Sequence, residues 1–412
     1  MPLLEILSIV IGFAALLAAA RMLGWAFECL HQPRLVGEIA AGVLLGPFVI
    51  GRWLPETQPA ASGLSGFYWV GLLALMFLSG TEMRRLFARD NRREVAWLCG
   101  LGTLAPFALM LLLAAWLPVS AIAHPEAPRV SVVMVLAIGT AVTSIPVITR
   151  IFHDLGILKT RFASLILGTA ALDDIFLWAV LAVATALASG AGTTFGAAAQ
   201  HLAATLGFMA VGFTVAPRII RRLPHRAPLL TALAILAGYV LAARALQVDL
   251  VFAAFVAGYG IAGTKLVEAL APLRQVSFAV FIPVYFALIG QRLELGREFS
   301  LALFAVFLLG SSLLRMLSAG AASYVAGFRG LEPFNIAAAL NARGGPGIVL
   351  AGIAFEAQII NAAFYTTLVL TAIVTSQTAG AWLMYVLRKG WPLLVERQRD
   401  TEEARVPVQA AA

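Results

Sequence analysis

Charged residues are scarce in this chain of 412 residues. Asp, Glu, Lys and Arg make up 12% of it, 61% of the residues are hydrophobic, and the mean hydropathy is +0.92. A soluble domain carries about 25% charged residues, so a set of soluble domains is excluded and an all-α polytopic membrane protein is predicted. The net charge of +8 is explained by basic loops between the spans, and no nucleic-acid partner is expected.

Cysteine and histidine are also rare. Cys29 and Cys99 are too few for a disulfide framework and lack the spacing of metal ligands. The five histidines are scattered and form no cluster in the sequence. We therefore expect no metal centre, no cofactor and no enzymatic activity.

Apolar runs separated by charged or Pro/Gly-rich breaks predict thirteen transmembrane helices. The predicted spans are residues 4–26, 35–51, 66–83, 95–117, 129–149, 162–188, 196–217, 228–245, 248–263, 275–290, 299–322, 333–356 and 361–387. An odd number of spans places the two termini on opposite sides of the membrane.

Loop charge predicts the orientation of these spans. With the N-terminus outside, the 18 basic residues of the cytoplasmic loops are Arg34, Arg84, Arg85, Arg89, Arg92, Arg93, Arg150, Lys159, Arg161, Arg218, Arg221, Arg222, Arg226, Lys265, Arg274, Arg329, Arg388 and Lys389. The 5 basic residues of the opposite loops are Arg52, Arg129, Arg244, Arg292 and Arg297. This asymmetry predicts an outer N-terminus and a cytoplasmic C-terminus, in a membrane such as a bacterial inner membrane.

Two of the predicted spans are interrupted. The fifth contains Thr143, Ser144 and Pro146, and the twelfth contains Arg343 followed by Gly344-Gly345-Pro346. Proline and glycine disfavour a continuous helix, and non-helical backbone survives at membrane depth only inside protein or beside an aqueous cavity. Interrupted helices in both halves of a chain indicate a transporter site between inverted repeats. Two proline kinks with packing roles remain the alternative.

Two adjacent carboxylates, Asp173 and Asp174, lie in the middle of the sixth span. A charge at the centre of a membrane helix costs about 2.5–3.5 kcal/mol, so such residues are usually functional. Neighbouring helical positions are about 100° apart and cannot face the same partner. We therefore pair Asp173 with Arg315, deep in the eleventh span, and leave Asp174 to bind a proton or a monovalent cation.

Other polar residues are expected to complete this site. Thr143 and Ser144, with the carbonyl groups freed at the break, are predicted to support the bound ion; hydrogen bonding within a kinked helix is the alternative. Arg343 is a second deep basic residue that can offset the charge of the cavity. Glu38 and Glu356 are further buried acids that could pair with a deep arginine.

Four motifs in order resemble the second family of monovalent cation:proton antiporters. They are QPRLVGEIAAGVLLGP at 32–47, LMFLSGTEM at 75–83, TSIPV at 143–147 followed by the aspartate pair, and NARG at 341–344. The resemblance covers residues 30–390. It implies a homodimer with a dimerisation domain and a mobile ion-binding core, in which the fifth and twelfth helices cross beside the aspartates.

The resemblance also implies roles for single residues. It makes Asp174 the ion carrier and pairs Asp173 with the base of the eleventh span. That base is usually lysine in the family, whereas this chain has Arg315, which is harder to deprotonate. Gly347 stands where many relatives carry an acid.

The resulting expectation is a membrane antiporter domain over residues 1–390 and a short, disordered cytoplasmic tail over 391–412, without a nucleotide-binding regulatory domain. The expected activity is exchange of Na⁺ or K⁺ for H⁺ by alternating access, because the two ions compete for one carboxylate. The alternatives are a proton-coupled exporter of a small organic solute, and a membrane sensor or ion channel.

Overall fold

The computed structural model describes residues 3–29, 34–46, 61–82, 92–189, 195–222, 227–293 and 299–395, which contain helices and no extended strand. Residues 396–412 of the predicted tail lie outside the described residues, as do the basic loop residues Arg52, Arg84, Arg85, Arg89, Arg226 and Arg297. A single isolated bridge, between Ala123 and Ile360, is the β-structure of the described part.

The α-helices are α1 (Leu3–Cys29), α2 (Arg34–Leu45), α3 (Ala61–Glu82), α4 (Arg92–Cys99), α5 (Ala105–Leu113), α6 (Arg129–Ala141), α7 (Ile145–Asp154), α8 (Arg161–Ser189), α9 (Phe195–Ala210), α10 (Ala216–Ile220), α11 (Pro228–Ala245), α12 (Leu250–Ile261), α13 (Ala271–Val276), α14 (Ile282–Gln291), α15 (Leu301–Ala326), α16 (Glu332–Leu340), α17 (Gly344–Glu356) and α18 (Ala362–Arg388). Short helical turns are η3 (Gly100–Leu104), η4 (Val119–Ala121), η5 (Val211–Val215), η6 (Glu268–Leu270) and η7 (Ser277–Phe281).

Each predicted span coincides with one helix or with consecutive helices, and the two predicted breaks are present. The fifth span divides into α6 and α7, and the twelfth divides into α16 and α17. Within the described residues, 10 helical segments are long and apolar enough to cross a membrane, and α6 and α12 are shorter apolar helices. The all-α membrane fold is therefore confirmed, while the count of thirteen spans stays a prediction.

Three long spans contain a five-residue π-helical turn that ends two residues before a proline. The turns η3, η5 and η7 precede Pro106, Pro217 and Pro283, each at the start of the next α-helix. Proline lacks the N–H that would continue the helix and clashes with the preceding turn, and a wider turn accommodates both effects. The residues of η3 are of special interest because they reach the candidate site.

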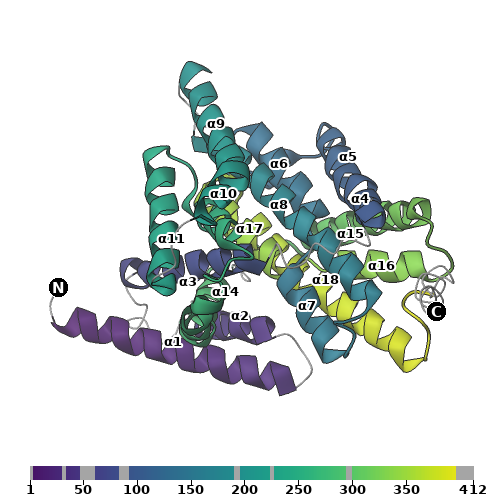
Figure 1. Cartoon of the computed structure of the whole chain (residues 1–412), viewed down its shortest axis with the longest axis horizontal. Helices are drawn as coiled ribbons and strands as arrows, with labels where there is room; N and C mark the ends of the chain where they lie inside the picture. The colour runs from purple at the N-terminus through teal and green to yellow at the C-terminus, as the bar shows by residue number, and fades with distance from the viewer. Residues whose placement is uncertain are drawn as a thin grey trace, which may run out of the picture.

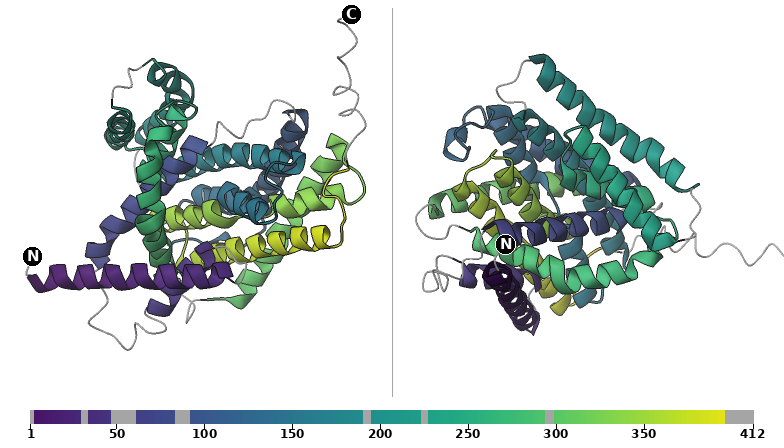
Figure 2. Two further views of the ribbon diagram at one scale, coloured as in Figure 1. Left: turned by 60° about the horizontal axis from the view of Figure 1, so that its bottom comes forward. Right: turned by 90° about the vertical axis from the view of Figure 1, so that its left-hand side faces the viewer.

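The helices form two groups (Figure 1). The first, which we call the scaffold group, contains α1–α3 and α9–α14, with α3 packed on α12 and α2 packed on α1 and α14. The second, the site group, contains α4–α8 and α15–α18, with α15 on α16, α17 on α18 and α6 on α8. Helix α1 lies at the rim of the scaffold group (Figure 2). Helix α17 is buried from Gly344 to Ala354 and crosses the middle of the molecule.

Reciprocal glycine contacts join two pairs of helices in the scaffold group, α2 with α14 and α3 with α12. A Cβ atom at Gly42 of α2 would lie 1.8 Å from a carbonyl oxygen of α14, and one at Gly290 of α14 would lie 2.1 Å from a carbonyl oxygen of α2. In the same way, a Cβ atom at Gly80 of α3 would lie 2.2 Å from a carbonyl oxygen of α12, and one at Gly258 of α12 would lie 2.0 Å from a carbonyl oxygen of α3. Normal contacts are about 3.5 Å, so only glycine lets these backbones touch.

Two ion pairs among the described residues join the scaffold group to the site group. Arg150 of α7 contacts Glu28 of α1 at 2.5 Å. Arg292, directly after α14, pairs with Glu356 at the end of α17 and lies 4.4 Å from the centre of the Tyr68 ring. Glu356 therefore pairs with Arg292 near the end of its helix, whereas the sequence offered it as a partner for a deep arginine. Its side chain is 33% exposed, which explains why it needs no deep partner.

Candidate functional site

The two interrupted helices cross at their breaks and are hydrogen-bonded to each other there. The backbone N–H of Ser144 donates to the carbonyl of Ala342 at 2.7 Å, and the hydroxyl of Thr143 donates to the carbonyl of Leu340 at 2.6 Å. Helix ends leave backbone groups without partners, which is costly away from water. Each break therefore supplies partners for the other.

Gly344 allows this crossing to be close. Its φ angle is +37°, in the region that favours glycine, and a Cβ atom there would lie 2.4 Å from Val147 Cγ2 and 2.7 Å from Ser144 Oγ. Its N–H donates to the hydroxyl of Ser376 on α18 at 3.1 Å. A side chain at this position would push α7 and α17 apart.

Asp173 is held by two polar partners on other helices. Its Oδ2 lies 2.6 Å from Nη2 of Arg315, and its Oδ1 accepts a hydrogen bond from the hydroxyl of Thr103 at 2.5 Å. Both charged side chains are fully buried. The pairing of Asp173 with Arg315, inferred from helical geometry, is thus a contact in the structure.

Arg315 uses all five of its N–H donors, a number fixed by its guanidinium group. In addition to Asp173, Nη2 donates to Thr143 Oγ1 at 2.6 Å and Nε donates to the Leu340 carbonyl at 3.3 Å. Nη1 donates to Thr103 Oγ1 at 2.9 Å and to the carbonyl of Gly102 in η3. Arg315 therefore joins α15 to η3, to both breaks and to α8.

Asp174 differs from its neighbour. It is 2% exposed, and its Oδ1 has no hydrogen-bond partner among the described residues. Adjacent helical positions point about 100° apart, so the Arg315 guanidinium that serves Asp173 is directed away from it. Asp173 is therefore neutralised by Arg315, whereas Asp174 has no ion-pair partner among the described residues.

Arg343, at the start of α17, is also buried. Its Nη1 donates to the hydroxyl of Ser311 at 2.8 Å, and its guanidinium carbon lies 5.7 Å from the centre of the Phe307 ring. Its Nε and Nη2 have no hydrogen-bond partner in the described residues. The two partners named here, Ser311 and Phe307, are both on α15.

The structure brings most of the predicted site residues together and separates one. Thr143 contacts Arg315, and the Ser144 hydroxyl accepts the Val147 N–H at 3.4 Å, capping α7. Glu38, by contrast, is buried on α2 beside Gly24 of α1, and no ion pair joins it to Arg343 in the described residues. No group of three or more potential metal ligands occurs there either.

Thr103 and Ser311 were missed by sequence reasoning. Each carries a hydroxyl that contacts a buried arginine from another helix. A single Thr or Ser in an apolar span is usually bonded to its own helix, so the sequence gives no signal for such a role. Only the packing of α15 against η3 and the breaks reveals it.

The family model for "Sodium/hydrogen exchanger, transmembrane" matches residues 13–389. The chain belongs to the sodium/hydrogen exchanger family. It is 25% identical over 395 residues to the Na⁺/H⁺ antiporter NhaS4 of Synechocystis sp., covering 90% of this chain and 95% of that relative. It is 26% identical over 388 residues to the Na⁺/H⁺-K⁺ antiporter GerN of Bacillus cereus, covering 90% and 94%.

A solved structure of a sodium proton antiporter shares the fold. The sodium proton antiporter MjNhaP1 from Methanocaldococcus jannaschii, solved at pH 8, aligns with a TM-score of 0.61. The alignment covers 92% of this chain and 97% of that structure at 14% identity. At this identity the similarity establishes the fold, so the roles of single residues in this exchanger must be argued from its own site.

Proposed function

We propose that this exchanger transports Na⁺ or K⁺ in exchange for H⁺, with Asp174 as the group that binds either ion. The observation that supports this is the buried Asp174 carboxylate with an unpartnered Oδ1. A bare carboxylate away from water is strongly unfavourable, and either a proton or a small cation neutralises it. Since the two ions compete for the same oxygens, binding of one releases the other.

Asp173 has a different proposed role, which is to anchor the site. Its charge is balanced by Arg315, and both of its oxygens have partners at 2.5 and 2.6 Å. Thr143 and Ser144 support the ion site by position, because their polar groups join the two breaks. Asp174 is then the group in this cluster whose charge changes during exchange.

Exchange of one cation for one proton follows from the bonding of Arg315. Arginine stays protonated in proteins, and each of the five donors of Arg315 is engaged. The Asp173–Arg315 pair therefore contributes no proton of its own. One monovalent cation replaced by one proton moves no net charge, so the proposed exchange is electroneutral.

Alternating access needs one part of the protein to move against another. We propose that the site group carries the ion and that the scaffold group stays fixed and forms a homodimer, as the resemblance implies. The scaffold group is joined by close backbone contacts, which suits a static role. The 18-to-5 distribution of basic loop residues supports an outer N-terminus and a cytoplasmic C-terminus, in a bacterial inner membrane.

The test is proton movement in proteoliposomes, followed with an internal pH-sensitive dye after addition of Na⁺, K⁺, Li⁺ or choline. Asp174→Asn removes the charge with little change in volume and should abolish cation-dependent proton release. Asp249→Asn is the matched control, since Asp249 caps α12 through the N–H groups of Val251 and Phe252 and asparagine caps equally well. Full exchange by a folded Asp174→Asn variant would sink the proposal, and a response to choline alone would favour an organic solute.

A further inference from the structure

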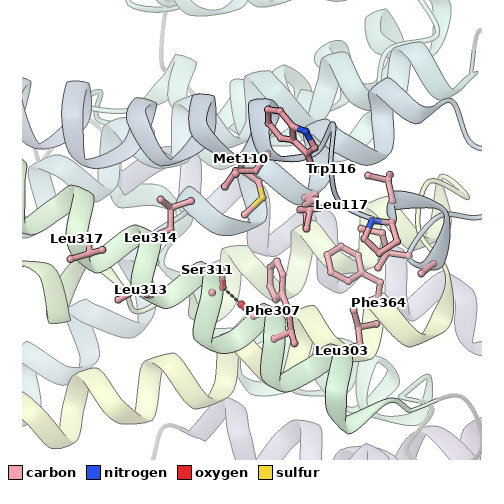
Figure 3. Close-up of a pocket in the computed structure, with 18 residues that line it drawn as sticks. Met110, Trp116, Leu117, Leu303, Phe307, Ser311, Leu313, Leu314, Leu317 and Phe364 are labelled. Atoms are coloured by element: carbon pink, nitrogen blue, oxygen red, sulfur yellow. Dashed lines mark hydrogen bonds between the residues drawn. The ribbon is translucent and has the colours of Figure 1, made fainter.

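An apolar cavity of about 440 Å³ opens between α5 and α15. We call it the α5–α15 groove. Figure 3 shows Met110, Trp116 and Leu117 on one side of it, with Phe307 and Leu314 of α15 facing them. Its lining is almost wholly hydrocarbon, with Ser311 as the main polar side chain.

The groove opens at the outer surface of the helices, where its side chains are exposed. Trp116 is 80% exposed, and Leu313 and Leu317 of α15 are 61% and 62% exposed. Helix α15 and the span that ends with α5 are both long and apolar enough to cross a membrane. The surroundings of the groove are therefore lipid hydrocarbon.

The length of the groove suits a lipid chain. Its lining on α15 extends from Leu303 to Leu317, which at 1.5 Å per residue is about 21 Å. The hydrocarbon core of a bilayer is about 30 Å thick, so one leaflet supplies chains of about 15 Å depth. A chain from one leaflet lying along α15 can thus cover about two-thirds of the groove.

A cation lies at the end of the groove. Arg129, exposed at the start of α6, donates from Nη2 to the carbonyl of Ala114 at 3.0 Å, directly after α5. The groove residues Leu113 and Trp116 flank that carbonyl in sequence. Tryptophan favours the membrane interface, and a guanidinium group binds phosphate with charge-assisted hydrogen bonds.

We propose that the α5–α15 groove binds one phospholipid, with an acyl chain along α15 and the phosphate at Arg129. An empty apolar cavity loses dispersion contacts on its lining, and a cavity of about 150 Å³ already takes up a small apolar molecule. The larger groove faces acyl chains continuously. A second copy of this chain would also cover it, but the cation at its end favours a ligand with an anionic head.

The bound chain would press on residues that reach the ion site. Phe307 and Ser311 form the floor of the groove, and both contact Arg343 on the opposite side. Phe307 also packs edge-on against Phe364 of α18, with ring centres 5.2 Å apart. Phospholipid binding is therefore expected to raise the melting temperature by fixing this floor.

The chain offers a matched pair of variants on one helix. Gly310 lines the groove and Gly320 does not, and a Cβ atom at either position meets no atom within 4 Å. Gly310→Leu therefore adds a side chain at the groove from a Cβ position without close neighbours, while Gly320→Leu makes the same change outside it. Both replacements raise helix propensity equally. Arg129→Gln removes the cation at a surface position.

Native mass spectrometry of delipidated protein, titrated with dioleoyl phosphatidylglycerol or dioleoylglycerol, tests the proposal. The parent and Gly320→Leu should each retain one phosphatidylglycerol per protomer and melt at a higher temperature with it, and Gly310→Leu should lose both effects. Arg129→Gln should retain phosphatidylglycerol about tenfold more weakly, as expected for loss of a charge-assisted contact. Its affinity for phosphatidylglycerol should then equal the affinity of the parent protein for dioleoylglycerol, which has no phosphate.

Equal phosphatidylglycerol retention by Gly310→Leu and Gly320→Leu would overturn the proposal. So would unchanged lipid retention together with a dimer-to-monomer shift in Gly310→Leu, because that result assigns the groove to a second copy of the chain. Retention of dioleoylglycerol as strong as that of phosphatidylglycerol would reject the phosphate site at Arg129. None of these outcomes depends on ion exchange.

Discussion

Thr103 provides the sharpest test of how the buried ion pair is stabilised. Its hydroxyl donates to Asp173 at 2.5 Å and accepts from Arg315 at 2.9 Å. Thr103→Val keeps the shape and removes both bonds. Hydrogen bonds to charged groups contribute about 1.5–3 kcal/mol each, so the expected loss in the free energy of unfolding is about 3–6 kcal/mol.

This loss is measurable by thermal unfolding in detergent. At about 2.1 cal/mol/K per residue, a chain of 412 residues has an unfolding entropy of roughly 0.9 kcal/mol/K, and the melting temperature should fall by about 3–7 °C. Thr185→Val is the control, because within the described residues the Thr185 hydroxyl bonds the carbonyl of Ala182 in its own helix, at 3.0 Å, and no other group. If Thr103→Val and Thr185→Val melt within a degree or so of each other, the ion pair does not depend on the Thr103 hydroxyl, and the reasoning fails.

Three further predictions concern the same cluster. Asp173→Asn leaves Arg315 as a buried charge without a carboxylate and should destabilise the protein by about 3–5 kcal/mol, whereas a parental melting temperature would show that the pair is not structural. Gly344→Ala should impair folding or exchange, because the added Cβ atom would lie 2.4 Å from Val147. Gly345→Ala is the control, since a Cβ atom there meets no atom within 4 Å. Equal melting temperatures and equal transport rates of the two variants would contradict a tight crossing. Exchange should proceed at one rate whether the membrane potential is clamped at zero or at either sign, and a voltage-dependent rate would exclude the electroneutral cycle.

The features that the sequence predicted are those encoded locally. Pro146 and the run that begins at Gly344 disfavour a continuous helix whatever surrounds them, so both breaks were visible in the sequence. The unequal environments of Asp173 and Asp174 followed from the 100° step between adjacent helical residues. Arg315 was predicted as a partner because a deep arginine in a membrane span needs one.

The features that the sequence did not predict depend on the rotation of one helix against another. Ser311 and Arg315 lie one turn apart on α15 and face two different buried partners, which no periodicity in a uniformly apolar span reveals. Glu356 was expected to be a deep acid, but it lies at the end of α17 and pairs with Arg292. A difference of one helical turn decides between these two positions, and the sequence does not fix span boundaries that finely. Glu38 likewise faces α1 and not the crossing.

The glycine contacts between α2 and α14, and between α3 and α12, limit how the protein can move. Two helices that touch through Gly42 and Gly290, or through Gly80 and Gly258, are locked in register, because a slip of one residue brings a side chain to a position with room only for a hydrogen atom. The two helices of each pair must therefore move together or stay still together. If the site group moves against the scaffold group as proposed, the movement must break the Arg150–Glu28 and Arg292–Glu356 pairs, which are partly exposed and cost only about 1 kcal/mol each to break.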